Sequence, residues 1–387
     1  MKKIFGLQKN IFLLGVVSFL NDLSSEMILS VLPAFFTSVL KAGAASLGLV
    51  EGVAEAGANF IKIYAGSLSD KIQKRKPFIV SGYLLSVITR PIYLLVSSVA
   101  GVVGIRLADR VGKGLREGPR DAIISLSSPQ EELGKSFGYH RAMDTAGAIV
   151  GPLIAYLILR RFPTGFNKVF ITAFIAGILA VGATLFITDV IGNYKKKKMT
   201  LASLALFPKG FKIYLLALFI LSVGSLPVAV MLLKTQSIGL TLASIPLFYV
   251  LYNISYSGFS ISGGKLSDKL GPKKIIFTGY LFLIASYIIL LFDKSLLLLV
   301  VGFLVLGIFP ALTDGVQRSY AAMLTEEENR GGAYGLVNAV SGFGALIAGI
   351  GGGFIWQRFG SGTAFFISII FIIIGLVVLS LTKSKND

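Results

Sequence analysis

The sequence has 387 residues, of which 54% are hydrophobic and only 14% are charged. Its mean hydropathy of +0.79 lies outside the usual range of water-soluble globular chains, which excludes a simple soluble domain. The formal net charge of +18 could indicate nucleic-acid binding, but a basic binding domain would need a water-soluble module, and no stretch of the sequence provides one. We therefore expect a membrane protein with no nucleic-acid partner.

The cysteine and histidine counts limit the catalytic and metal-binding chemistry that the chain can carry. The chain has no cysteine and one histidine, which excludes disulfides, thiol nucleophiles and thiolate metal sites. An enzyme would need a nucleophile paired with a base, a cofactor loop or a soluble domain, and the sequence offers none of these. We expect no enzyme activity, no bound cofactor and no metal centre.

Apolar stretches long enough to cross a bilayer recur from end to end of the chain. A spanning helix needs about 20 residues, and these runs are continuous rather than alternating, which favours helices over a transmembrane barrel. Polar breaks between the runs define twelve expected helices, with no cleavable signal peptide before the first. These helices cover 10–39, 45–69, 77–97, 99–126, 133–160, 167–189, 211–235, 241–267, 273–292, 296–323, 329–357 and 361–382. The sequence thus predicts an all-α polytopic membrane protein.

Lysine and arginine gather in alternate loops. The loop after the helix at 45–69 holds Lys71, Lys74 and Arg75, and the mid-chain linker holds four consecutive lysines at 195–198. Basic loops stay in the cytoplasm, and an even number of helices places both termini on the same side. We expect a multi-pass protein of the cell (inner) membrane with both termini cytoplasmic.

The helix at 10–39 carries Asn21, Asp22 and Glu26. Ionisable groups at membrane depth are costly and mark function. Four-residue spacing places Asp22 and Glu26 on one helix face, and two close carboxylates hold a proton more readily than one. This pair is a candidate for proton coupling. A salt bridge to the helix at 99–126 and exposure near a mouth of the protein are the alternatives.

A short segment after the helix at 45–69 is repeated in the second half. Residues 66–71 (GSLSDK) reappear as 264–269 (GKLSDK), 198 positions later. Such a repeat indicates two related halves. Glycine permits close helix approach, and aspartate can pair with arginine, so we expect cytoplasmic latches joining Asp70 to Arg120 and Asp268 to Arg318. Solvated loop charges that only set topology are the alternative. The latch candidates are Gly66, Asp70, Arg75, Arg120, Gly264, Asp268 and Arg318.

The helix at 99–126 is unusually charged. Positions 106, 110, 113, 117 and 120 trace one helical stripe, which lipid could not accommodate, so we expect it to face a cavity or neighbouring helices. The candidates for coupling or transport on this helix are Arg106, Asp109, Arg110 and Lys113. A purely structural ion network is the alternative.

The helix at 133–160 opens with His140, Arg141 and Asp144 and continues through Gly147 to Gly151. The glycine pair permits close helix packing, and the proline that follows it bends the backbone. His140 and Asp144 are coupling candidates, because a histidine can relay protons or bind a metal. A latch or an ordinary interfacial residue is the alternative for His140.

The second half offers softer chemistry. Aromatic and amide groups there can shape a substrate pocket, although core or interfacial tyrosines are common. The pocket candidates are Asn21 from the first half with Tyr252, Asn253, Tyr256, Asp314, Gln317 and Asn338. We expect an N-terminal six-helix bundle at 1–190, a basic cytoplasmic linker at 191–210 and a C-terminal six-helix bundle at 211–387.

At the repeated loop the chain resembles the major facilitator superfamily, whose signature reads roughly Gly-x-Leu-x-Asp-Arg/Lys-x-Gly-Arg/Lys-Arg/Lys. The first loop matches from Gly66 to Arg75 except that Gln73 replaces the later glycine, and the second matches from Gly264 to Lys274 with one extra residue. The resemblance covers essentially the whole chain. It implies two pseudo-symmetric six-helix bundles that expose one central site alternately to each side.

Two further motifs of that superfamily are partly present. Arg110 and Gly114 fit the motif Arg-x-x-Gln-Gly, with Lys113 at the glutamine position, and Gly147 to Pro152 resembles the antiporter motif of exporting members, although its final glycines are absent. The resemblance implies a secondary active transporter, most similar to the proton-coupled drug or metabolite exporters. It would act as a monomer in contact with lipid, with a small-molecule substrate and the proton as coupling ion. The alternative is an importer or metal-ion carrier of the same fold, with Asp22 and Glu26 among its ligands.

Overall fold

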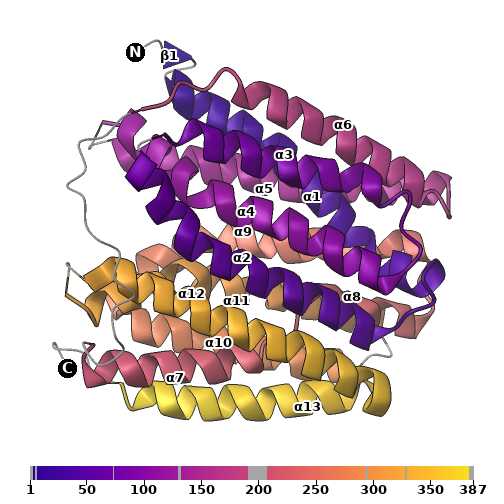
Figure 1. Cartoon of the computed structure of the whole chain (residues 1–387). Helices are drawn as coiled ribbons and strands as arrows, with labels where there is room; N and C mark the ends of the chain where they lie inside the picture. The colour runs from indigo at the N-terminus through magenta and orange to yellow at the C-terminus, as the bar shows by residue number, and fades with distance from the viewer. Residues whose placement is uncertain are drawn as a thin grey trace. The chain divides into compact units, whose positions relative to one another are not determined.

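The computed structural model describes residues 3–4, 7–72, 74–129, 132–190, 207–292, 295–326 and 329–382. At positions 66, 67, 70 and 71 it describes the backbone but not the side chains. Contacts divide the chain into two compact units (Figure 1). The first contains the described residues of 1–40, 57–197 and 242–247, and the second contains the described residues of 41–56, 198–241 and 248–387.

The first unit is built almost entirely of helices. A short antiparallel pair of strands precedes the first helix. The elements of the first half of the chain are β1 (Lys3–Ile4), β2 (Leu7–Gln8), α1 (Lys9–Ser38), α2 (Ala44–Ile72), α3 (Lys76–Ile92), α4 (Val99–Ser127), α5 (Leu133–Arg161) and α6 (Phe166–Thr184). The start of α2 groups with the second unit, so this helix is divided between the two.

The second half of the chain is also helical, with more breaks. Its elements are α7 (Lys209–Val223), α8 (Val228–Leu232), the 3-10 helices η3 (Leu233–Ile238) and η4 (Leu242–Ser244), α9 (Ile245–Leu270), α10 (Pro272–Leu291), α11 (Leu296–Met323), α12 (Arg330–Ile347), the π-helix η6 (Ala348–Gly352) and α13 (Gly353–Ser380). The segment 242–247, which includes η4, groups with the first unit.

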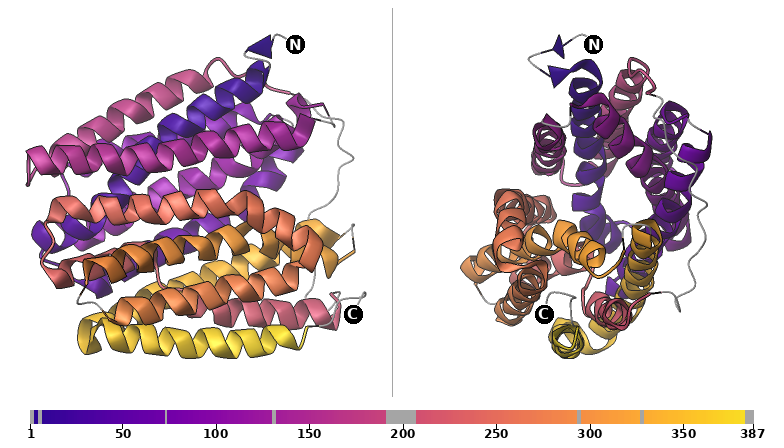
Figure 2. Two further views of the ribbon diagram at one scale, coloured as in Figure 1. Left: turned by 180° about the vertical axis from the view of Figure 1, so that it is seen from behind. Right: turned by 90° about the vertical axis from the view of Figure 1, so that its left-hand side faces the viewer.

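The same pattern of helix neighbours occurs within each unit. In the first, α1 packs against α5 and α6, and α3 packs against α4 and α6. In the second, α7 packs against α12 and α13, and α10 packs against α11 and α13 (Figure 1 and Figure 2). This correspondence is the structural counterpart of the repeated segments at 66–71 and 264–269, and the duplication therefore extends to the packing of whole helices.

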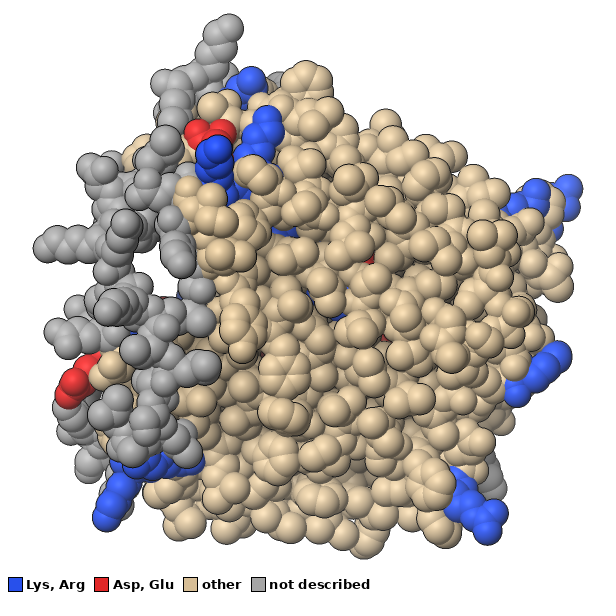
Figure 3. Space-filling model, viewed as in Figure 1, with Lys and Arg blue, Asp and Glu red and all other residues tan. Residues whose placement is uncertain are grey.

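The surface of the helices is apolar where a soluble protein would be polar. Leu157, Ile175, Phe366 and Val377 are each more than half exposed, and on the face drawn in Figure 3 charged side chains lie at the margins around a broad uncharged field. Exposed apolar area of this extent is what lipid requires and water penalises. Seven helical stretches among the described residues are long and apolar enough to cross a membrane.

Charge explains why α4 is not one of those seven stretches. It carries eight ionisable side chains between Arg106 and Asp121, and Arg106, Asp109 and Arg116 are nevertheless buried. Such groups can lie at membrane depth only when the protein surrounds and pairs them. These three buried charges therefore pack inside the first unit.

The expected helix at 211–235 is broken, which corrects the sequence prediction. Its first part, α7, ends at Val223, and a new turn begins at Pro227, which has no amide hydrogen to continue the helix. The Tyr287 hydroxyl donates to the Gly224 carbonyl at 3.2 Å and accepts from the Leu226 amide at 2.9 Å. One side chain of α10 thus satisfies backbone groups that the break exposes.

Other boundaries differ by a few residues. The helices expected at 77–97 and 167–189 end earlier, at Ile92 and Thr184. The helix expected from 241 begins at Ile245, after the 3-10 turn η4. The break expected between 357 and 361 is a single residue, Gly360, whose φ of 87° favours glycine.

Candidate functional site

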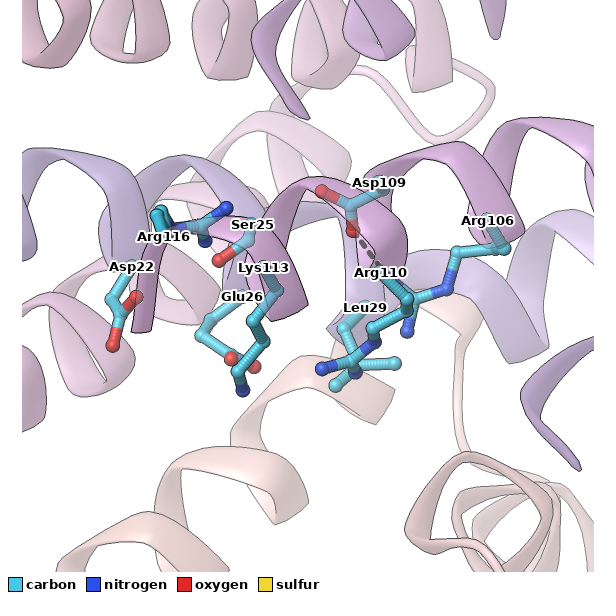
Figure 4. Close-up of a pocket in the computed structure, with 9 residues that line it drawn as sticks. All are labelled: Asp22, Ser25, Glu26, Leu29, Arg106, Asp109, Arg110, Lys113 and Arg116. Carbon is cyan, nitrogen blue, oxygen red and sulfur yellow. Dashed lines mark hydrogen bonds and ion pairs between the residues drawn. The ribbon is translucent and has the colours of Figure 1, made fainter. Parts of the chain in front are cut away.

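An open cavity of about 300 Å³ lies inside the first unit, between α1 and α4. Figure 4 shows the side chains that line it. They are Asp22, Ser25, Glu26 and Leu29 from α1 and Arg106, Asp109, Arg110, Lys113 and Arg116 from α4. Six of the predicted coupling candidates, three carboxylates and three cations, therefore line one cavity. The cations of α4 face the carboxylates of α1 across it.

Asp109 is the centre of a buried ion cluster. Its carboxylate lies 3.0 Å from Arg90 Nη1 of α3 and 3.1 Å from Arg106 Nη1. Both arginines are 1% exposed and Asp109 is 4% exposed. A carboxylate held between two guanidinium groups stays ionised, because neutralising it would leave two positive charges without a counter-charge in a low dielectric. We interpret Asp109 as an anchor for the two arginines.

The same pair of helices is held together by small residues. A Cβ added at Gly82 of α3 would lie 2.6 Å from the Gly112 carbonyl oxygen of α4, so only glycine allows this approach. Arg116 fills the next turn, donating to the Ser86 hydroxyl at 2.7 Å and stacking over the Tyr83 ring at 4.5 Å. Close packing of α3 on α4 thus positions the cations that line the cavity.

The carboxylates of α1 face the cations of α4 rather than lipid. In Figure 4 the side chains of Asp22, Glu26, Arg110 and Lys113 extend into the same open space. Asp22 also accepts a hydrogen bond from the neighbouring Asn21 amide at 3.0 Å. This arrangement fits both readings of the carboxylate pair, proton coupling and ionic contact with α4, and it does not fit exposure at a helix end.

A second cluster lies where α5 packs on α1. The Asp144 carboxylate accepts a hydrogen bond from the Ser18 hydroxyl of α1 and lies 3.6 Å from His140 Nδ1 and 3.9 Å from Arg141 Nη1. His140 is 4% exposed, which corrects the alternative of an ordinary interfacial residue. The histidine and aspartate predicted on this helix are therefore brought into contact.

Glycines of α5 bring this cluster close to Asp22. A Cβ at Gly147 would lie 2.4 Å from the Phe19 carbonyl oxygen and 3.1 Å from Asp22 Cβ. A Cβ at Gly151 would lie 2.4 Å from the Leu23 carbonyl oxygen. The backbones of α1 and α5 are thus in contact, and Asp144 lies one turn before the residue that touches Asp22. Asp144 is thus a second carboxylate close to the α1–α5 contact at Asp22, which spacing along α1 alone could not indicate.

The C-terminal part of α4 carries a chain of opposite charges. Glu117 accepts from Lys62 of α2 at 2.9 Å and lies 3.8 Å from Lys113. Arg120 pairs with its neighbour Asp121 at 3.0 Å. Lys113 therefore contacts a carboxylate at its own helix while it lines the cavity.

The structure describes only some of the predicted latch contacts. The Asp70 side chain and the Gly66 Cα environment lie outside what the structure describes, so the pairing with Arg120 stays a prediction. Asp268 and Arg318 are both exposed, and no ion pair joins them among the described residues. Gly264 has no atom within 4 Å of an added Cβ, so helix approach does not require glycine there.

Arg75 has a partner that the sequence did not reveal. It is 1% exposed and donates from Nη1 to the Val190 carbonyl at 3.0 Å, while its backbone amide donates to the Asp189 carboxylate at 3.0 Å. Asp189 thus caps the start of α3 from the segment after α6. At the offset of 198, Lys273 takes the place of Arg75 and donates to the carbonyls of Ser380 and Thr382 after α13.

The pocket candidates of the second half form an aromatic row on α9. Tyr252 lies 5.6 Å from Tyr249 and 6.2 Å from Tyr256 between ring centroids. The Tyr256 hydroxyl donates to Asp314 at 2.8 Å. Two of the predicted residues, Tyr256 and Asp314, are therefore in direct contact.

The remaining pocket candidates are partly accounted for by packing. The Gln317 side-chain amide donates to the Tyr280 hydroxyl at 3.3 Å, and the Gln317 backbone carbonyl accepts from the Tyr214 hydroxyl at 2.9 Å. Asn253 is buried and Asn338 is half-buried. Gln317 therefore has a structural role between α7, α10 and α11.

Sequence reasoning missed two buried cations. Arg90 lies in an apolar run before Pro91, and Lys234 lies in the run from Val228; the cost of charge at membrane depth could have identified both. Lys234 is 4% exposed and donates to the Ser361 hydroxyl at 2.9 Å. Ser18 carried no comparable signal, because a serine in a helix is ordinary. Among the described residues no group of three or more His, Asp or Glu side chains could hold a metal ion.

A polytopic helical protein with two related units, and with paired charges around a cavity at membrane depth, has the architecture of a membrane carrier. Comparison with known proteins agrees. The family model described as Major Facilitator Superfamily matches twice, at residues 14–233 and 213–386. The chain belongs to the major facilitator superfamily and is a secondary transporter, not an enzyme.

Individual relatives support the same assignment. An uncharacterised MFS-type transporter of Methanocaldococcus jannaschii is 37% identical over 96% of this chain and 95% of its own length. A solved mutant of the nucleoside transporter NupG is 18% identical, covers 97% of this chain and 100% of its own, and has a TM-score of 0.83. A POT family transporter solved with 5-aminolevulinic acid is 14% identical, covers 98% and 97%, and has a TM-score of 0.81. At these identities the two solved structures show the fold.

Proposed function

We propose that this transporter couples solute export to proton entry, with Asp22 and Asp144 as the groups that exchange protons. The observation that carries the proposal is the contact of α1 with α5. There, Asp144 is hydrogen-bonded to Ser18 and lies one turn from the glycine against Asp22. Glu26 completes the set from the cavity side.

Physical chemistry supports proton exchange at these groups. Burial and a second carboxylate nearby both favour the protonated form of a carboxyl group, whereas neighbouring cations favour the ionised form. Asp22 and Asp144 lie between such opposing influences, with Arg141 beside Asp144 and the cations of α4 beside Asp22. Asp109 is different, because two arginines hold its charge in place.

The asymmetry between the halves also supports coupling in the first. At the offset of 198, Asp22 corresponds to Ile220 and Arg110 to Ile308, while Lys113 corresponds to Ala311. The scaffold is duplicated and these ionisable groups are not. A function that needs charge at membrane depth is therefore assigned to the first half.

Export, location and assembly follow from weaker observations. The glycines at 147 and 151 resemble the antiporter motif of exporting members and form the contact of α5 with α1. Two solved structures of the same fold are a nucleoside transporter and a POT family transporter in complex with 5-aminolevulinic acid, which fits a small organic solute. We place the protein in the cell membrane as a monomer, with both termini in the cytoplasm by the distribution of basic loops.

One observation favours a second candidate, proton-driven import. Protonation of Asp22 or Glu26 would remove negative charge beside Arg110 and Lys113, so protons and a negatively charged solute would favour each other's binding. Coupling of that sign moves the solute and the proton in the same direction.

The test is transport by the full-length protein in proteoliposomes of known orientation. Vesicles loaded with a defined mixture of organic acids, phosphate esters, nucleosides and short peptides receive a pH gradient, and mass spectrometry follows each compound. With the extracellular side acidic, we expect one class of solute to leave the compartment on the cytoplasmic side faster than without the gradient. A protonophore should abolish the difference.

The other outcomes decide between the candidates. Accumulation of a solute on the cytoplasmic side under the same gradient would establish import instead. Solute movement that is identical with and without the gradient would contradict proton coupling in either direction.

A further inference from the structure

The charges around the cavity of the first unit do not balance. Its lining holds four cations, Arg106, Arg110, Lys113 and Arg116, against three carboxylates, Asp22, Glu26 and Asp109. Arg90 adds a fifth buried cation through its contact with Asp109. With every carboxylate ionised, this group of eight side chains therefore carries two positive charges in excess.

The excess falls on one side of the cavity. Asp109 is already shared by Arg90 and Arg106, at 3.0 and 3.1 Å, so it offers little compensation to other cations. Glu117 lies 2.9 Å from Lys62 and 3.8 Å from Lys113, so one carboxylate is shared by two cations and compensates Lys113 only in part. A net positive charge at membrane depth is costly, and an anion in the cavity would relieve that cost.

The cations that extend into the cavity are suited to an acidic group. Arg110 and Lys113 lie three residues apart on one face of α4 and point into the same space in Figure 4. A guanidinium group presents a planar fork of donors that matches carboxylate or phosphate oxygens, and an ammonium group adds a mobile point charge. Ser25 and Leu29 supply a hydroxyl and an apolar surface on the facing wall.

We propose that the transported solute is a small organic anion whose carboxylate or phosphate group binds Arg110 and Lys113 in this cavity. The proposal rests on the proposed function only in taking the cavity as the transport site. Because protonation of Asp22 or Glu26 would favour binding of such an anion, this assignment supports the second candidate, proton-driven import, over export.

Binding to the purified full-length protein in detergent tests this assignment without any gradient. The probes are matched pairs that differ in charge: glycerol 3-phosphate with glycerol, benzoate with benzamide, and glutarate with glutaramide. Thermal unfolding is followed for wild type, Arg110→Gln, Lys113→Gln and the charge-conserving Lys113→Arg. Arg161→Gln is the matched control, because it removes a cation at the far end of α5, outside the cavity.

We expect the charged member of at least one pair to stabilise wild type and Arg161→Gln while its neutral partner does not. Loss of a charge-assisted contact should weaken that binding about tenfold or more in Arg110→Gln and Lys113→Gln, and Lys113→Arg should retain it. Reaction of Lys113 with an amine-specific reagent provides a readout in wild type that needs no variant, and the charged probe should slow it.

Three results would overturn the proposal: no charged probe stabilises the protein, neutral partners stabilise it equally, or both glutamine variants bind as wild type does. A reagent that modifies Lys113 at the same rate with and without the stabilising probe would also contradict it. Anion binding in a protein that ignores pH gradients would refute proton coupling and leave this assignment standing.

Discussion

A single buried carboxylate organises the charges of α4. Asp109 contacts Arg90 and Arg106 and is almost fully buried with them. Buried charges are stable only when each has its counter-charges, because these interactions replace the hydration that each group loses on burial. The geometry of the cavity wall thus depends on one residue that itself has no freedom to exchange a proton.

Replacing Asp109 should therefore be severe. Asp109→Asn keeps the shape of the side chain but leaves two buried guanidinium groups without a counter-charge, and we expect a loss of about 3–5 kcal/mol of stability. Asp121→Asn is the control, because that carboxylate is 45% exposed beside Arg120 and should cost at most about 1 kcal/mol. Unfolding of the detergent-purified variants measures both. Equal stability of the two variants would contradict the anchoring role.

Helix ends in this protein are satisfied by distant side chains. The amides of Arg75 and Lys76 donate to Asp189, at the start of α3, and Tyr287 bridges the break before α8. In both places a helix end that lacks a local cap is completed by a distant side chain, from the segment after α6 for α3 and from α10 for α8. These contacts fix where α3 and α8 begin.

Loss of the cap at α3 should be measurable. Asp189→Ala removes the acceptor for two amide groups, and we expect a cost of about 0.5–2 kcal/mol. The matched control is Asn329→Ala at the start of α12, where the side chain makes no capping bond and the effect should stay within about 0.5 kcal/mol. Urea-induced unfolding in mild detergent compares them; a control as damaging as Asp189→Ala would refute the capping account.

The glycine contact between α1 and α5 gives a second prediction at the scale of helices. Gly147→Ala would place a Cβ 2.4 Å from the Phe19 carbonyl oxygen, and we expect overpacking to cost about 1–3 kcal/mol. Gly138→Ala on the same helix meets no atom within 4 Å and should be neutral or slightly stabilising. Thermal unfolding distinguishes them, and a neutral Gly147→Ala would mean that the backbones do not touch.

Helices could be predicted from the sequence better than their interruptions. Long apolar runs identify the spans because lipid admits few other structures, and the ends at 99 and 323 agree with α4 and α11. The break after Val223 was missed, because its stability depends on Tyr287 from another helix rather than on local residues.

The sequence predicted which residues form the site, but not all of the contacts that they make between helices. Charge at membrane depth identified Asp22, Glu26 and the stripe on α4. Spacing along α1 predicted that Asp22 and Glu26 lie on one face, and both line the cavity. Packing adds Asp144 from α5, close to the glycine contact beside Asp22. Partners from different helices depend on packing, which a helix period does not encode.

At the scale of the whole molecule, the two halves share a scaffold and differ in charge. Corresponding helices have corresponding neighbours in each unit, and Arg75 and Lys273 make similar contacts with the last residues of their halves. Positions equivalent to Asp22 and Arg110 are isoleucines. We therefore propose that proton coupling belongs to the first half and that the duplicated loops share a structural role.

The most direct test compares gradient-driven transport with exchange at equal pH on the two sides. In proteoliposomes, Asp22→Asn and Asp144→Asn should retain exchange of a transported solute between the two compartments but lose the acceleration by a pH gradient. Asp314→Asn in the second half, taken relative to its own exchange rate, should keep that acceleration. If both first-half variants respond to the gradient as wild type does, or if Asp314→Asn alone loses the response, proton coupling does not reside where we have placed it.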